Sequence, residues 1–471
     1  MPQISKDDYS ILVVEGQELQ RNTMRVERNR SIHICSDIQN DLYFPKDLLS
    51  KHMLMLGSIG SGKSNMLFHV VDAVKSSLQQ NDCMIFFDSK GDYVSNFCTQ
   101  KDIIVGNSQW VKTRFCNKGL DQRVQYWNIF SDLSQDTLLD SIREISTALF
   151  KKSIESAQNP IFPRGARDMF SSIIYAFYKK SFIEIGRGRT VLVGGQKKLL
   201  DNHVLKVFFD GFSIDSFQSL ISGIPEIEWV NTYISSGAKT NTTQSYLTYL
   251  NAIPQEIFNN DFGKSGYFSI RGFINDGSCQ SVFLEYDIAN GNSLDIIYTV
   301  MLDIAMKEAL GKQRNGNIYF ILDEFPLIPK LSYFDNLLNF GRSLGVKVIA
   351  GIQNVGQVYS KYDIYLGNSI LSGFSSYFAF KLFDQASRDI VKQRHGKNRC
   401  ITAIKKYGFD GYDIHVQEND VINDWILTSL GIGKCVVSIP DYPPFVFKAS
   451  EYTNFQKTKI RINKSVVSES P

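Results

Sequence analysis

Residues 57–64 read Gly57-Ser58-Ile59-Gly60-Ser61-Gly62-Lys63-Ser64, which is a complete G-x-x-x-x-G-K-[ST] phosphate-binding loop. The apolar run 52–56 before it has the length of a buried strand, and segment 65–77 after it carries apolar residues at helical spacing. Glycines at three positions let backbone N–H groups turn toward phosphate oxygens, with the positive end of a helix behind them. The motif therefore predicts that ATP is bound here, with the Lys63 ammonium on its phosphates and the Ser64 hydroxyl on Mg²⁺.

A second motif supplies the carboxylates that nucleotide hydrolysis requires. The apolar run 317–322 ends in Asp323-Glu324, the pattern of a buried strand that delivers two acids at its carboxyl end. Ligands of doubly wound parallel sheets bind at that end of the strands. We expect Asp323 to contact Mg²⁺ through water and Glu324 to act as general base toward the attacking water. Taken alone, the same motif also fits two solvated acids in a surface turn.

Composition and charge are those of an intracellular enzyme. The 471 residues predict two to three domains or one large domain with an insertion, and 51 basic against 48 acidic residues leave a net charge of only +3. Any contact with nucleic acid must therefore be local. The seven cysteines are scattered without C-x-x-C spacing, which favours buried free thiols. No run approaches the ~18–20 apolar residues of a membrane helix and no leader pattern opens the chain, so a cytoplasmic location is expected.

Strand and helix patterns alternate along much of the chain, which predicts an α/β fold with a central, mostly parallel sheet flanked by helices. We expect strands at residues 267–271 and 281–286, joined by a turn at 275–278. The predicted organisation is an N-terminal arm (1–35), the first part of a nucleotide-binding domain (36–150), an all-α insertion (151–264), the second part of the nucleotide-binding domain (265–451) and a polar, disordered tail (452–471).

Several motifs in one order carry a family resemblance. They are the phosphate loop, Asp88-Ser89-Lys90-Gly91, an insertion that opens near Asn159-Pro160-Ile161-Phe162, Asp323-Glu324-Phe325-Pro326, residues 337–345 and residues 349–354. Over residues 40–450 the chain resembles conjugative coupling proteins of the TraD/TraG type, in the FtsK/HerA superfamily of DNA-pumping motors. Residues 236–240 resemble the family's loop in the all-α domain. The resemblance implies a P-loop NTPase (RecA-like) fold and a ring, usually hexameric, that threads DNA through a central channel as ATP is hydrolysed between subunits.

Two further residues fit that chemistry. Gln353 follows a predicted strand beside the acidic one, where its amide would touch both the γ-phosphate and the attacking water; a polar strand cap is the alternative. Arg342 lies 19 residues after Asp323, across a predicted helix, which suits the active site of a neighbouring subunit. A solvated helix-end arginine is the alternative for Arg342. The basic group of Arg388, Arg394 and Lys397 fits a subunit interface, DNA or a solvated face.

The chain also departs from that family, whose members normally begin with membrane helices. It either relies on a partner such as a relaxase or a secretion channel, or it acts as a cytosolic motor with a nuclease, as HerA-like members and some anti-phage defence systems do. Two functions therefore stay open. The first is a hexameric ATPase that translocates DNA of any sequence. The second is a nucleotide-gated scaffold or HerA-like subunit that hydrolyses ATP slowly and recruits an effector.

Overall fold

The computed structural model describes residues 11–15, 31–36, 41–45, 48–184, 188–234, 241–276, 280–289, 291–311, 313–405, 412–440 and 442–453. The chain divides into two compact units. The first unit comprises residues 1–79, 319–327 and 335–471, and the second comprises residues 80–318 and 328–334. Neither unit corresponds to one continuous stretch of sequence.

The first unit holds six strands of the central sheet, in the order β18-β17-β14-β4-β13-β12. β4 pairs in parallel with β13 and β14, whereas β17 runs antiparallel to β14 and β18. The strands are β4 (Met53–Leu56), β12 (Ile318–Leu322), β13 (Val346–Ile352), β14 (Ser376–Ala379), β17 (Lys434–Ser438) and β18 (Phe445–Lys448). The helices are α1 (Lys63–Ser76), α11 (Phe334–Phe340), α12 (Gly356–Gly373), α13 (Gln385–His395) and α14 (Asp424–Ser429).

The strands at the middle of this unit are apolar on both faces. Every residue of β4, β12 and β13 is buried. A strand covered on both faces has no solvent side to carry polar residues, so it reads as a continuous apolar run rather than an alternating one. Because β4 and β13 are parallel neighbours, their carboxyl ends lie at one edge of the sheet, and the phosphate loop follows β4 there.

The second unit holds the other four strands, in the order β5-β11-β6-β7, and all three of these pairings are parallel. These strands are β5 (Cys83–Asp88), β6 (Ile103–Val105), β7 (Val124–Gln125) and β11 (Ser281–Glu285). Five helices of this unit are α2 (Asp92–Phe97), α3 (Ser108–Phe115), α4 (Leu138–Ser156), α9 (Ile270–Asp276) and α10 (Gly291–Gly311), of which α4 extends into the expected insertion. A central, mostly parallel sheet flanked by helices is the predicted α/β fold.

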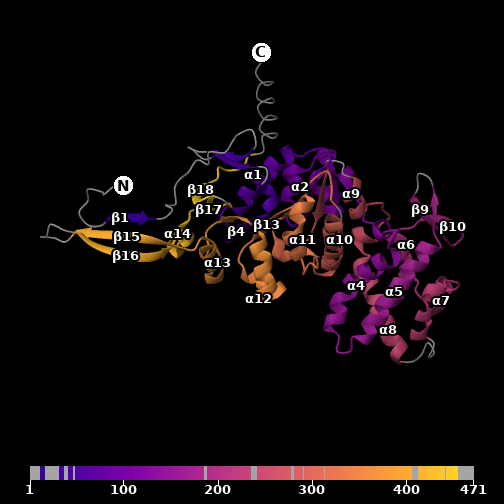
Figure 1. The fold of residues 1–471 in the computed structure, drawn as a ribbon. Helices are drawn as coiled ribbons and strands as arrows, with labels where there is room; N and C mark the ends of the chain where they lie inside the picture. Colours follow the sequence, from indigo (N-terminus) through magenta and orange to yellow (C-terminus); the bar gives the residue numbers. More distant parts are fainter. Residues whose placement is uncertain are drawn as a thin grey trace, which may run out of the picture. The chain divides into compact units, whose positions relative to one another are not determined.

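Segment 151–264 is mostly helical, but a small sheet interrupts the helices. α5 (Ile161–Lys179), α6 (Asn202–Asp210), α7 (Ile214–Ile221) and α8 (Asn241–Ile257) gather in one bundle with α4, and α5 contacts α4, α7 and α8 (Figure 1). β8 (Phe182–Glu184), β9 (Gly188–Val193) and β10 (Gln196–Leu199) form an antiparallel sheet. The segment is therefore not all-α. The loop at residues 236–240 lies outside the described residues.

The strand expected at residues 267–271 is wrong. Phe268 makes only an isolated bridge to Trp127, and α9 begins at Ile270. The Ser269 hydroxyl accepts a hydrogen bond from the Gly272 N–H (2.8 Å), which stabilises the first turn of a helix. The Asp132 carboxylate, 139 residues from Arg271 in the chain, accepts the Arg271 N–H at 2.9 Å. A distant carboxylate and a local cap together favour the helix over the strand.

The chain ends lie largely outside the described residues, including the tail beyond residue 453. Within the expected arm, β1 (Ile11–Glu15) forms a three-stranded antiparallel sheet with β15 (Lys397–Lys405) and β16 (Tyr412–Asp420), which Figure 1 shows side by side. β2 (Ser31–Ser36) pairs with β3 (Asp41–Pro45). Across the described part of the chain, none of the helices combines the length and the apolar character needed to cross a membrane.

Candidate nucleotide site

The phosphate loop turns sharply between β4 and α1. Gly60 and Gly62 have φ values of +74° and +101°, in the left-handed region that favours glycine. A Cβ atom on Gly62 would lie only 2.7 Å from the Gly433 Cα atom, so a side chain there has no room as well as an unfavourable backbone. α1 begins immediately afterwards at Lys63. The loop therefore has the strand, glycine turn and helix that the sequence motif predicted.

Segments from distant parts of the sequence hold this loop in place. The Ser58 N–H and hydroxyl both donate to the Lys381 carbonyl, at 3.0 and 2.9 Å. The Gly57 N–H donates to the Ile352 carbonyl at 3.2 Å, and the Gly433 N–H donates to the Ser61 carbonyl at 2.9 Å. Lys381 and Gly433 lie outside every motif, so sequence reasoning missed both. Their contribution is a backbone group, which any residue type supplies.

Lys63 places a buried positive charge at the loop. Its side chain is 7% exposed, and its Nζ atom donates to the carbonyls of Gly57 at 3.2 Å and Ile352 at 3.4 Å. Ile352 is the last residue of β13. The ammonium group therefore lies between the phosphate loop and the carboxyl end of the neighbouring strand, where a triphosphate would face it.

The two acids follow β12 as predicted. Asp323 is 7% exposed, which contradicts the reading of this motif as two solvated acids. Gly351 of β13 packs against it, since a Cβ atom at Gly351 would lie 2.1 Å from the Asp323 carbonyl oxygen and 3.1 Å from Oδ1. Glu324 is half-buried, and its carbonyl accepts the Leu327 N–H at 2.8 Å. Gly351 is a further site residue that sequence reasoning did not single out.

Gln353 connects β13 to the acids. It directly follows the strand, and its Nε2 atom donates to Glu324 Oε2 at 3.2 Å. The neighbouring residue Ile352 accepts the Lys63 ammonium. Lys63 contacts the backbone just before Gln353, and Gln353 contacts Glu324, so these three residues lie at one edge of the sheet in the first unit. Buried Asp323 directly precedes Glu324 in the chain. The amide of Gln353 therefore contacts Glu324, the predicted general base.

Arg342 lies at the other end of β13. It belongs to a short 3-10 helix (Gly341–Leu344) and is exposed, and β13 begins four residues later. A seven-residue strand spans roughly 23 Å, so Arg342 cannot reach the phosphate loop of its own chain. The positive charge of Arg342 acts instead on His52, which directly precedes β4. Burial is the main cause that lowers the pKa of His52 to about 4, and the charge of Arg342 lowers it further. The predicted direction of Arg342, away from its own loop, agrees with this position.

Asp88, the last residue of β5 in the second unit, holds the start of a helix. Its carboxylate accepts the backbone N–H groups of Gly91 at 2.8 Å, Tyr93 at 2.8 Å and Val94 at 3.0 Å, and so holds the first turn of α2. Glu285 lies opposite it in the β5–β11 register and is fully buried. Burial, and then the charge of Asp88, raise the pKa of Glu285 well above its usual range. Glu285 was not predicted, because only the strand pairing brings it to Asp88.

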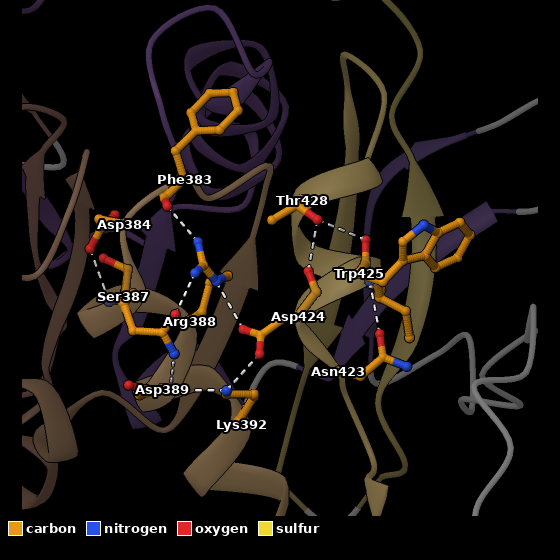
Figure 2. Close-up of polar contacts among 12 residues, drawn as sticks. Phe383, Asp384, Ser387, Arg388, Asp389, Lys392, Asn423, Asp424, Trp425 and Thr428 are labelled. Carbon is orange, nitrogen blue, oxygen red and sulfur yellow. Dashed lines mark hydrogen bonds and ion pairs between the residues drawn. The ribbon is translucent and has the colours of Figure 1, made fainter.

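The basic group near residue 390 is engaged within the first unit (Figure 2). Arg388 Nε donates to Asp424 Oδ1 at 2.8 Å, and Arg388 also donates to the Phe383 carbonyl. Lys392 Nζ lies 3.0 Å from carboxylate oxygens of both Asp424 and Asp389. Lys392 first and then Arg388 hold the pKa of Asp424 below its usual range. These contacts tie α13 to α14.

Arg394, in the same basic group, packs elsewhere in the unit. It donates to the Ser375 carbonyl, and its guanidinium carbon lies 4.2 Å from the centroid of the Tyr377 ring. Arg388 and Arg394 therefore have partners inside their own unit, which favours a structural role over contact with DNA.

The glycine turn, the buried lysine and the two acids at the ends of parallel strands define a P-loop NTPase fold. A family model for the type IV secretion-system coupling protein DNA-binding domain matches residues 39–413. The chain belongs to this family.

Known proteins of the same kind resemble the chain at low sequence identity. The coupling protein TraD of Escherichia coli (strain K12) is 20% identical over 428 residues, a match that covers 88% of the chain but only 55% of TraD, so the chain spans about half of that relative. The unbound form of the bacterial conjugative coupling protein TrwBdeltaN70 has a TM-score of 0.68 and 17% identity over 91% of the chain and 90% of the TrwBdeltaN70 chain. TrwB in complex with ADP and Mg²⁺ has a TM-score of 0.63 and 17% identity, over 87% of the chain and 88% of TrwB.

Proposed function

We propose that the chain is an ATP-driven DNA translocase of the coupling-protein type. The observation that carries the proposal is that Lys63 donates to the carbonyl of Ile352, the last residue of β13, while the next residue, Gln353, donates to Glu324 after β12. Membership of a family of DNA-binding domains supports DNA as the partner, and TrwB, a protein of the same fold, has been seen with ADP and Mg²⁺. The proposed DNA contact is independent of base sequence, as movement along DNA of any sequence requires.

Each residue has a defined part in this reaction. The loop N–H groups and Lys63 hold the triphosphate and stabilise the charge that develops on it. Ser64 and Asp323 are the residues that would hold Mg²⁺, which neutralises phosphate charge when bound. Glu324 takes a proton from the attacking water, and Gln353 orients that water through its contact with Glu324.

Hydrolysis is proposed to take place between subunits of a homo-oligomeric ring, with a hexamer as the expected state. Arg342 is exposed and lies far from its own phosphate loop, which suits a role in the site of an adjacent subunit. An arginine supplied in this way stabilises transition-state charge and contributes on the order of 10³–10⁵ in rate. A cytoplasmic location is part of the proposal.

Steady-state ATP hydrolysis with and without DNA tests the proposal. Two DNA molecules of unrelated sequence should each raise the rate severalfold, and Lys63→Ala should abolish the activity. Particle mass measured with ATP and DNA should correspond to a ring. Slow hydrolysis that DNA does not change would instead support a nucleotide-gated scaffold that recruits a nuclease, a relaxase or a secretion channel, and a strictly monomeric protein would refute the translocase.

A further inference from the structure

Three strongly exposed apolar side chains border the phosphate loop. Ile59 is 84% exposed, Phe383 66% and Ile432 79%. Each stands on a segment that reaches the loop, although the three segments are far apart in the sequence. Exposed apolar side chains are ordinary when scattered, but a group of them beside a binding site marks a surface that something covers.

Backbone hydrogen bonds fix these side chains relative to the loop. Ile59 is part of the loop itself. Phe383 lies two residues beyond Lys381, whose carbonyl accepts both the N–H and the hydroxyl of Ser58. Ile432 precedes Gly433, whose N–H donates to the Ser61 carbonyl at 2.9 Å. A nucleotide whose phosphates lie on the loop would therefore have the segments of Phe383 and Ile432 beside it.

The segment that carries Phe383 is held firmly from behind. The Phe383 carbonyl accepts a hydrogen bond from Arg388, and the Leu382 N–H donates to the Leu427 carbonyl of α14 at 3.0 Å. Figure 2 shows the Phe383 ring pointing away from the Arg388 and Asp424 side chains. Arg388 and Asp424 are thus paired with each other behind the ring, whereas the Lys381 ammonium lies 5.3 Å from the centroid of the Phe383 ring. The rest of the ring, which is 66% exposed, presents an aromatic surface on a rigid support.

We propose that Phe383 and Ile432 form the seat of the nucleobase of the bound nucleotide. This inference rests on the proposed function, which places the triphosphate on the loop. Ribose and base extend beyond the phosphates, so they must cover surface that borders the loop. A purine is neutral and flat, so it suits an aromatic ring on one face and a branched apolar side chain on the other. Each of these contacts replaces water on a face of the purine. Since every base has a π-face, the seat should accept ATP and GTP alike.

The test compares ATP with inorganic tripolyphosphate, a probe that has the phosphates but no base. Binding of each to the full chain is measured calorimetrically in the presence of Mg²⁺. Phe383→Ala should weaken ATP binding about tenfold, as expected for the loss of one stacked aromatic ring. It should leave tripolyphosphate binding unchanged, and Phe383→Trp should keep ATP binding near that of the unchanged protein.

Two variants make the comparison specific. Ile432→Ser removes the second apolar group and should also weaken ATP binding alone. Trp425→Ala is the matched control, because Trp425 is a 74% exposed aromatic whose side chain points in another direction from Phe383 (Figure 2). ATP affinity should be unaffected by that change. All of these residues are exposed, so the variants should fold.

The possible failures are distinguishable. Unchanged ATP affinity in both Phe383→Ala and Ile432→Ser would overturn the base seat while leaving the phosphate site intact. If the variants weaken the binding of ATP and of tripolyphosphate equally, the two residues shape the phosphate loop. That result would also overturn the base seat. Failure of the unchanged protein to bind either probe would refute the proposed function first, and the base seat with it.

Discussion

Gly351→Ala should disable the site by moving Asp323. A methyl group at position 351 would lie 2.1 Å from the Asp323 carbonyl oxygen, a backbone atom that cannot turn aside. Restoring an ordinary contact needs a shift of about 1 Å, a misplacement that costs on the order of 100-fold in rate at a catalytic site. The overpacking itself should lower the free energy of unfolding by about 1–3 kcal/mol.

Turnover with ATP and unfolding by denaturant measure these two effects separately. Gly311→Ala is the matched control, because a Cβ atom there meets nothing within 4 Å. That variant should keep both its rate and its stability. If Gly351→Ala folds and hydrolyses ATP at the rate of the unchanged protein, contact with β13 does not set the position of Asp323, and the reasoning is refuted.

Three other changes test the acids and the ring. Glu324→Gln keeps the shape but cannot accept a proton, so ATP should still bind while the single-turnover rate falls by about 100-fold or more; an unchanged rate would remove Glu324 from the chemistry. Arg342→Ala should bind ATP but turn over poorly, and mixing it with Lys63→Ala should restore some activity; no recovery in proven mixed assemblies would contradict a shared site. The pKa of folded Glu285 is raised, so this residue keeps a proton that the unfolded chain releases, and stability should fall as the pH rises above the ordinary pKa of a glutamate. Glu285→Gln should lessen that fall, and an unchanged profile in denaturant titrations would count against it.

The placement of the main site residues could be predicted because it depends on one geometric rule. The phosphate loop that leads to Lys63 follows an apolar run, as do Asp323 and Gln353, and the carboxyl ends of parallel strands meet at one edge of a sheet. The sequence shows the runs and the residues that follow them. It does not show which strands are neighbours, and so it could not predict the close approach of Gly351 to Asp323.

The errors arose where a distant residue decides a local conformation. Residues 267–271 are rich in β-forming types, yet the contacts of Ser269 and of Asp132, from another segment, start a helix there. The small sheet of β8 to β10 has a local signal in the sequence, which includes the strand-type run 190–193. Gly194 and Gly195 join β9 to β10 with φ values of +56° and +78°, as a two-residue hairpin turn requires.

β13 has a particular consequence for the proposed ring. Gln353 follows its carboxyl end beside Glu324, while Arg342 lies just before its amino end. All seven residues of the strand are buried and packed, so one end cannot move far without the other. Under the proposed function, a change sensed at the γ-phosphate by Gln353 therefore reaches Arg342, which serves the next subunit. A single strand would then connect two successive ATP sites. This connection favours sequential ATP hydrolysis around the proposed ring over hydrolysis that takes place independently at each site.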